Sequence, residues 1–150
     1  MSLSLVVWIG GIIFFAFAVA PTLFSILPTH DLAGKVVGRS LTTLHWMGLI
    51  SGIVYLICSL AYARLANGFV YPLAARNVLI VLMLLLTVIS LFAITPKMNA
   101  LKADMGVIDD VSKTDARRVE FNNWHVWSTR MEGGVLLMGL VVVWLTSKNT

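Results

Sequence analysis

The sequence predicts an all-α integral membrane protein, folded as a bundle of four transmembrane helices. Of its 150 residues, 59% are hydrophobic and 12% are charged, and the mean hydropathy is +0.90. Soluble domains carry about 25% charged residues, so this chain needs lipid to cover its apolar surface. Its length fits one short polytopic domain over residues 1–150 and excludes two domains or a large aqueous cleft.

Four apolar runs predict the spans. The run at residues 3–27 has no charge and is long enough to cross a hydrocarbon core of about 30 Å with tilt. It lacks the basic start and the short apolar stretch of a signal peptide, so we interpret it as a retained helix. The runs at 41–63 and 78–96 predict the next two spans, and the fourth span, 124–146, carries two charges in its first half.

Basic residues in the connections predict the orientation. The connections 28–40 and 97–123 hold seven Lys and Arg, whereas the opposite side holds three. The positive-inside rule therefore predicts a multi-pass protein of the cell (inner) membrane with both connections in the cytoplasm and both termini outside. The net charge of +4 is attributed to these loops and to anionic lipid headgroups, not to nucleic acid. Tryptophans are expected at the outer (Trp8, Trp144) and cytoplasmic (Trp46, Trp124, Trp127) interfaces.

The connection 97–123 is the only sizeable polar stretch of the sequence. Ser112 followed by Asp115 resembles a helix start, and residues 114–122 predict a short amphipathic helix before the fourth span. We favour a solvated helical extension over a partner-docking element, because mixed charges usually solvate a helix face.

Small residues predict close helix packing. Gly48 and Gly52 form a GxxxG spacing that lets two helices approach, and Gly10 and Gly11 lie together within the first span without a phosphate-loop sequence after them. The single cysteine, Cys58, lies in an apolar run and is expected to be a small packing residue.

The two halves of the chain match in outline, which predicts two repeated helical hairpins. Pro21 and Pro96 lie near the ends of the first and third spans, and His45 and His125 lie near the starts of the second and fourth. Such a repeat is related by an axis along the membrane normal and brings the two histidines to one depth.

Two polar stripes are expected to face the bundle interior. On the fourth span, i, i+3, i+4 and i+7 spacing places four residues on one face: His125, Ser128, Thr129 and Glu132. The second span has a similar stripe of His45, Gly48, Gly52, Tyr55 and Ser59. Glu132, Ser128 and Tyr55 are the predicted polar core. Arg130 projects away from Glu132, so Glu132 needs an internal partner, a proton or a water-filled cavity.

Three chemical interpretations of the histidines remain open. Opposed imidazoles of His45 and His125 would hold heme iron or chlorophyll. They would instead bind a transition metal together with Glu132 or a thioether of Met47 or Met131. The third interpretation is a polar anchor hydrogen-bonded across helices. No spacing matches a CxxCH or HExxH motif, and no catalytic residue is identified.

Four stretches carry a resemblance to a known family: WIGGIIFFAFAVAPTLFSILP, AGKVVGRSL, TPKMNALK and FNNWHVWSTRMEGG. The chain resembles the small membrane family of domain of unknown function 4149, which includes transmembrane protein 205, over nearly its whole length. The resemblance implies four helices and motif residues here at Trp8, Gly10, Gly11, Pro21, Phe24, Pro96, His125 and Ser128. It also implies an Asn in the last span where this chain has Glu132. A fainter similarity links the chain to copper-resistance protein D and to heme-binding protoporphyrinogen oxidases, whose Arg-rich first-helix motif is absent.

These observations leave three functional hypotheses. The first is a non-enzymatic membrane protein, an accessory or structural subunit or small binding module, with lipids and other membrane subunits or a second copy as partners. The second is an electron-transfer or pigment subunit with heme or chlorophyll between His45 and His125. The third is a metal or small-solute transport or resistance protein that uses Glu132.

Overall fold

A computed structural model describes residues 1–148, which form helices and no strand. Four helical rods are long and apolar enough to cross a membrane, at Ser2–Ile26, His30–Ala66, Ala75–Met105 and Ala116–Ser147. The predicted all-α membrane bundle is therefore confirmed.

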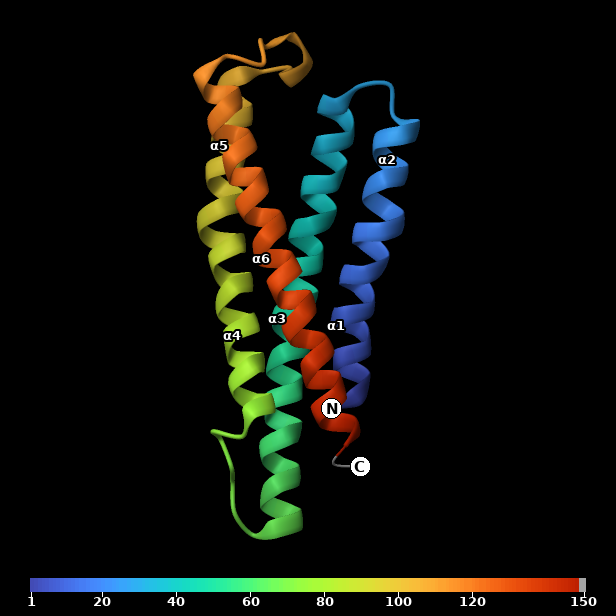
Figure 1. Cartoon of the computed structure of the whole chain (residues 1–150), viewed down its shortest axis with the longest axis vertical. Coiled ribbons are helices and arrows are strands. Elements are labelled where there is room, and N and C mark those ends of the chain that lie inside the picture. Colours follow the sequence, from blue (N-terminus) through green and yellow to red (C-terminus); the bar gives the residue numbers. More distant parts are fainter. Residues whose placement is uncertain (149–150) are drawn as a thin grey trace.

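The four rods comprise eight helical elements, and a ninth lies between the third and fourth rods. Figure 1 shows their arrangement. The first rod is α1 (Ser2–Phe14), the π-helical turn η1 (Phe15–Val19) and α2 (Ala20–Ile26), and the second is α3 (His30–Asn67). The third is α4 (Ala75–Ile89), the π-helical turn η2 (Ser90–Ile94) and α5 (Thr95–Met105). A short 3₁₀ helix, η3 (Ile108–Asp110), precedes α6 (Ala116–Ser147).

Helix α6 crosses the bundle obliquely, from α5 at one end to α1 at the other (Figure 1). At the end where the chain starts, α1 packs on α3 and α6, and α4 packs on the same two helices, which closes the bundle. At the opposite end α6 packs on α5, while α2 packs on α3 (Figure 1). At the end that carries the basic connections, the two hairpins meet through η3, which contacts α3, and through Lys102 of α5, which donates to the Gly34 carbonyl of α3 at 3.1 Å.

The helices run further than the predicted spans. Helix α3 starts at His30 and α6 at Ala116, so the segment 114–122 is mostly the first part of α6 and not a separate helix. The helix start expected at Ser112 lies three residues later, where the Asp115 side chain accepts a hydrogen bond from the Arg117 amide at 2.9 Å. At a rise of about 1.5 Å per residue, both helices exceed a hydrocarbon core of about 30 Å.

Pro21 and Pro96 lie inside continuous rods, each just after a π turn. The segments FAVAP (17–21) and FAITP (92–96) share their first, second and last residues, and each π turn ends two residues before its proline. The amides of Ala20 and Thr95 bond carbonyls five residues back, at Phe15 and Ser90. Proline lacks an N–H and clashes with the carbonyl four residues back, and a π turn relieves this crowding. Pro96 therefore does not end the third helix.

Turns and caps hold the ends of the hairpins. The Thr29 hydroxyl accepts a hydrogen bond from the Leu32 amide at 3.2 Å, and it caps α3. A carboxylate of η3 reaches the same helix start, where Asp109 Oδ2 accepts from the Asp31 amide at 3.1 Å. Gly68 and Gly106 have φ values of 74° and 71°, a conformation that suits glycine, and they end α3 and α5.

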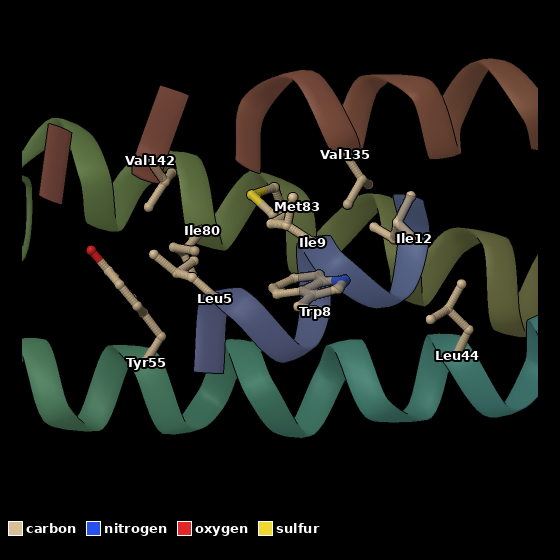
Figure 2. Close-up of a cluster of buried hydrophobic side chains, with 10 residues drawn as sticks. All are labelled: Leu5, Trp8, Ile9, Ile12, Leu44, Tyr55, Ile80, Met83, Val135 and Val142. Atoms are coloured by element: carbon tan, nitrogen blue, oxygen red, sulfur yellow. The ribbon is translucent and has the colours of Figure 1, made fainter. Parts of the chain in front are cut away.

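The apolar core lies where α1, α3, α4 and α6 meet (Figure 2). Trp8 is at its centre and only 2% exposed, so the prediction that Trp8 lies at the outer interface is wrong. Its indole fits against α3 because Gly48 and Gly52 have no side chain: a Cβ on Gly52 would lie 2.7 Å from Trp8 Cζ3. A Cβ on Gly11 would lie 3.0 Å from Leu44 Cδ1.

Two small residues do not pack as expected. Gly10 has no atom within 4 Å of a Cβ position, so Gly10 makes no close helix contact in the described chain. Cys58 is exposed on α3, which places its thiol on the outer surface and not in the helix packing.

Candidate functional site

A part-buried polar contact joins the second and fourth spans. The Nε2 atom of His45 on α3 and Oε2 of Glu132 on α6 lie 3.1 Å apart, and the His45 side chain is 2% exposed. A carboxylate only accepts hydrogen bonds, so an ionised Glu132 requires the proton on Nε2 of the imidazole. Glu132 thereby has the internal partner that its position requires.

The same region offers unused hydrogen-bonding capacity. Nδ1 of His45 is buried and has no hydrogen-bond partner in the described chain, and the Glu132 side chain keeps 19% of its surface exposed. The pair can therefore bind one more polar group, and Glu132 is its exposed side.

Other buried polar side chains also pair between helices. Tyr55 is fully buried, and its hydroxyl lies 2.9 Å from Thr146 Oγ1 on α6. Ser59 on α3 donates to Asn77 Oδ1 on α4 at 2.8 Å, and Ser90 in η2 donates to Met131 Sδ at 3.9 Å. Asn77 was not singled out from the sequence, although it is an isolated amide at the edge of an apolar run. The stripe from His45 to Ser59 faces the interior, as predicted.

His125 does not share the depth of His45. His45 lies level with Glu132, which is seven residues beyond His125, or about 10 Å along α6. His125 is exposed and so is Thr129, whereas Ser128 is buried. The structure therefore does not bring His45 and His125 together as opposed ligands, and the predicted single inward stripe on α6 holds only for Ser128 and Glu132.

The remaining charged and sulfur groups of the predicted site point elsewhere. The Arg130 guanidinium is exposed and lies 5.6 Å from the centroid of the Trp127 ring, so it does not pair with Glu132. No group of three or more His, Cys, Asp or Glu side chains within residues 1–148 is placed to hold a metal ion. Met131 instead accepts the hydrogen bond from Ser90.

His125 lines a hollow of about 350 Å³ at the end of the bundle that carries the basic connections. Lys102 of α5 and Arg118 and Asn122 of α6 line it too, and the sequence pattern did not single out any of these three. The connection 97–123 holds as many acidic as basic residues, so its composition did not reveal a cationic site, and the lining residues come from separate elements.

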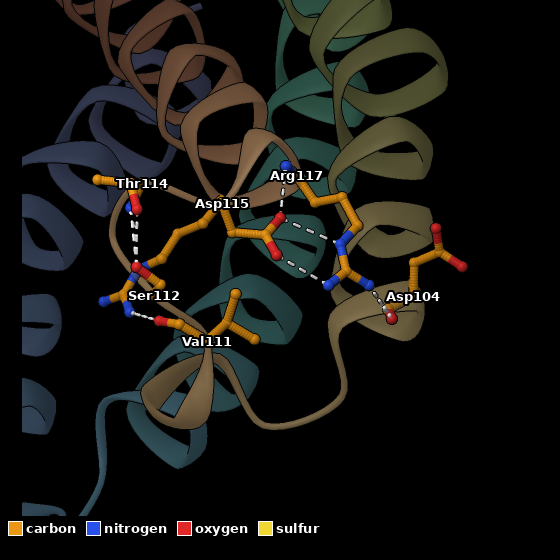
Figure 3. Close-up of polar contacts among 7 residues, drawn as sticks. Asp104, Val111, Ser112, Thr114, Asp115 and Arg117 are labelled. Atoms are coloured by element: carbon orange, nitrogen blue, oxygen red, sulfur yellow. Dashed lines mark hydrogen bonds and ion pairs between the residues drawn. The ribbon is translucent and has the colours of Figure 1, made fainter.

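The loop beside this hollow is ordered by an exposed ion pair (Figure 3). Arg117 donates from Nε and Nη2 to the two carboxylate oxygens of Asp115 at 3.1 and 2.9 Å, and from Nη1 to the Asp104 carbonyl at 3.0 Å. These hydrogen bonds from Arg117 lower the pKa of Asp115 to about 2. The pair fixes the start of α6 against the end of α5.

The apolar rods and the polar pairs between them define a helical, multi-pass membrane protein. The chain belongs to the family described as "Domain of unknown function (DUF4149)", which matches residues 3–106. No curated protein and no solved structure matches the chain, and the similarity to copper-resistance protein D is not supported. The matched residues cover the first three rods, so Glu132 and His125 lie beyond them.

Proposed function

We propose that the chain is a non-enzymatic membrane protein that serves as an accessory or structural subunit, or small binding module, of a membrane complex. The observation that supports this most is the His45–Glu132 contact of 3.1 Å between α3 and α6. Polar contacts between transmembrane helices contribute to helix association. His45 is almost completely buried, and one of its ring nitrogens lies against a carboxylate. This arrangement suits a side chain that holds two helices together better than one that contacts a substrate.

The outer surface supports partners within the membrane. Large apolar side chains cover it, and Leu3, Phe17 and Leu65 are 77%, 75% and 88% exposed. Gly10 and Gly133 have no atom within 4 Å of a Cβ position, and such small residues let another helix approach closely. Lipids, other membrane subunits or a second copy of the chain are therefore the proposed partners, in a cell membrane with both termini outside.

A second candidate function is metal or small-solute transport at Glu132. It is favoured by the partial exposure of Glu132 and by the unpartnered Nδ1 of His45. Ionisable groups inside membranes often mark ion or proton pathways.

Glu132→Gln separates the two candidates, and Arg130→Gln is the control, because it changes one charge on the same helix at an exposed position. We would measure native-gel mobility of the gently solubilised protein and proton or metal flux into reconstituted vesicles. An accessory module shows a bound partner or second copy and no flux above protein-free vesicles. A flux that Glu132→Gln abolishes while Arg130→Gln leaves it intact would assign transport instead.

A further inference from the structure

The hollow beside His125 is built from both hairpins. Its walls come from α2 and α3 of the first hairpin and from α5, η3, the following loop and α6 of the second. Its volume of about 350 Å³ lies within the range of about 300–1,000 Å³ that is usual for ligand sites. The lining side chains that matter most for a ligand are Phe24, Asp31, Lys102, Lys113, Arg118 and Phe121.

The charge of this hollow is unbalanced. Three basic side chains line it, Lys102, Lys113 and Arg118, and its one carboxylate, Asp31, forms an ion pair of 2.6 Å with Lys35 outside it. Within residues 1–148 none of the three cations forms an ion pair. Other basic residues at this end do: Lys35 with Asp31, Lys97 with Glu120, and Arg117 with Asp115.

Two of the cations are held in place by neutral groups. The half-buried ammonium of Lys102 donates to the Gly34 carbonyl at 3.1 Å and lies 5.4 Å from the Phe121 ring centroid. Arg118 donates from one guanidinium nitrogen to the Val111 carbonyl. Each cation keeps further N–H donors for a ligand, and side chains that are already positioned lose less conformational entropy on binding.

Aromatic side chains supply an apolar wall beside the cations. Phe24 of α2 is 44% exposed and Phe121 of α6 is 9% exposed, and both line the hollow. A free inorganic anion gains nothing from such a wall, whereas the glycerol and acyl ends of a lipid do. We propose that this hollow binds the phosphate group of an anionic phospholipid headgroup, with Lys102, Lys113 and Arg118 around the phosphate and Phe24 beside the lipid chains.

The test compares lipid retention in matched variants. Protein in nanodiscs of phosphatidylglycerol and phosphatidylcholine is released into mild detergent, and native mass spectrometry counts the lipids that stay bound. Lys102→Gln with Arg118→Gln removes two cations of the site. Arg39→Gln with Lys97→Gln removes one Arg and one Lys from the same end but outside the hollow. Lys113→Gln is a further site variant at an exposed residue, where folding is not at risk.

Each basic residue near an anionic lipid is worth about a fivefold change in affinity. We expect the wild type to retain phosphatidylglycerol over phosphatidylcholine, Lys113→Gln to weaken this about fivefold, and the double site variant more strongly. The control pair should retain lipid like the wild type. Equal losses in the site and control variants, or equal retention of both lipids, would show attraction by overall charge and overturn the site. Thermal stabilisation by inorganic phosphate but not by phosphatidylglycerol would overturn the lipid assignment in favour of a free anion.

Discussion

The indole ring of Trp8 lies against the bare backbone of Gly48, so closely that a Cβ on Gly48 would be 2.8 Å from Trp8 Cε2. This contact joins α1 to α3 at the centre of the core (Figure 2). In lipid, helices associate through close packing and not through exclusion of water, so a glycine that admits a large ring is a strong source of specificity.

Gly48→Ala should destabilise the protein by about 1–3 kcal/mol, the usual cost of overpacking a filled core. The measurement is unfolding in detergent micelles, by heat or by added dodecyl sulfate. Gly10→Ala is the control, because its added methyl group meets no atom within 4 Å. In a double-mutant cycle, Trp8→Ala should remove most of the cost of Gly48→Ala, since the clash partner is gone. Equal stabilities of Gly48→Ala and Gly10→Ala would contradict the packing described.

Glu132→Ala should destabilise the protein by about 1–3 kcal/mol, because it leaves both ring nitrogens of the buried His45 without a partner. Glu132→Gln should cost less, since its amide oxygen can still accept from Nε2. The same unfolding assay measures both, with exposed Thr129→Ala as the control on the same helix. If Glu132→Ala unfolds like the control, the contact does not stabilise the bundle.

The contribution of the Asp115–Arg117 pair to stability should be lost only in acid. The folded pKa of Asp115 is about 2 and its ordinary value is 3.8, so Asp115 contributes stability above pH about 4 that is lost as the pH falls toward 2. Carboxyl titration by nuclear magnetic resonance in micelles should give a low pKa, and Arg117→Gln should return the pKa toward 3.8. A low pKa that survives Arg117→Gln would point to another cause.

The sequence predicted the fold because composition and run length decide it in lipid, where backbone groups must bond internally and only helices or closed barrels span. The inward face of α3 followed from helical spacing, since His45, Gly48 and Tyr55 recur on one side. The buried face of the third rod was just as readable. Three of its polar residues, Asn77, Thr87 and Ser90, are buried, because lipid gives a polar side chain no partner.

Other features depended on contacts between distant segments. A tryptophan near a span end usually marks an interface, and only the glycines 40 and 44 residues further along admit Trp8 to the core. The prediction that His125 lies at the depth of His45 was wrong for a related reason. Helix α6 begins at Ala116 and crosses the bundle obliquely, so residues at equal positions in two predicted spans do not lie at equal depths. The cationic hollow combines five helical elements and a loop, and no local sequence pattern encodes their proximity.

The protein should show no absorption band in the visible range. An axial heme or chlorophyll ligand needs a free imidazole nitrogen aimed at the metal, and Nε2 of His45 lies 3.1 Å from Glu132 while Nδ1 is buried inside the packed bundle. His125 is two turns away along α6, so a ring between the two histidines would require the fourth span to slide by about 10 Å. Protein purified gently in detergent is scanned from the near ultraviolet to the far red, beside His45→Ala and His125→Ala. We expect three superimposable spectra without a Soret or chlorophyll band. A band that is present in the wild type and lost in both variants would mean that α6 packs differently when a cofactor is bound. The His45–Glu132 contact would then form only in protein without the cofactor.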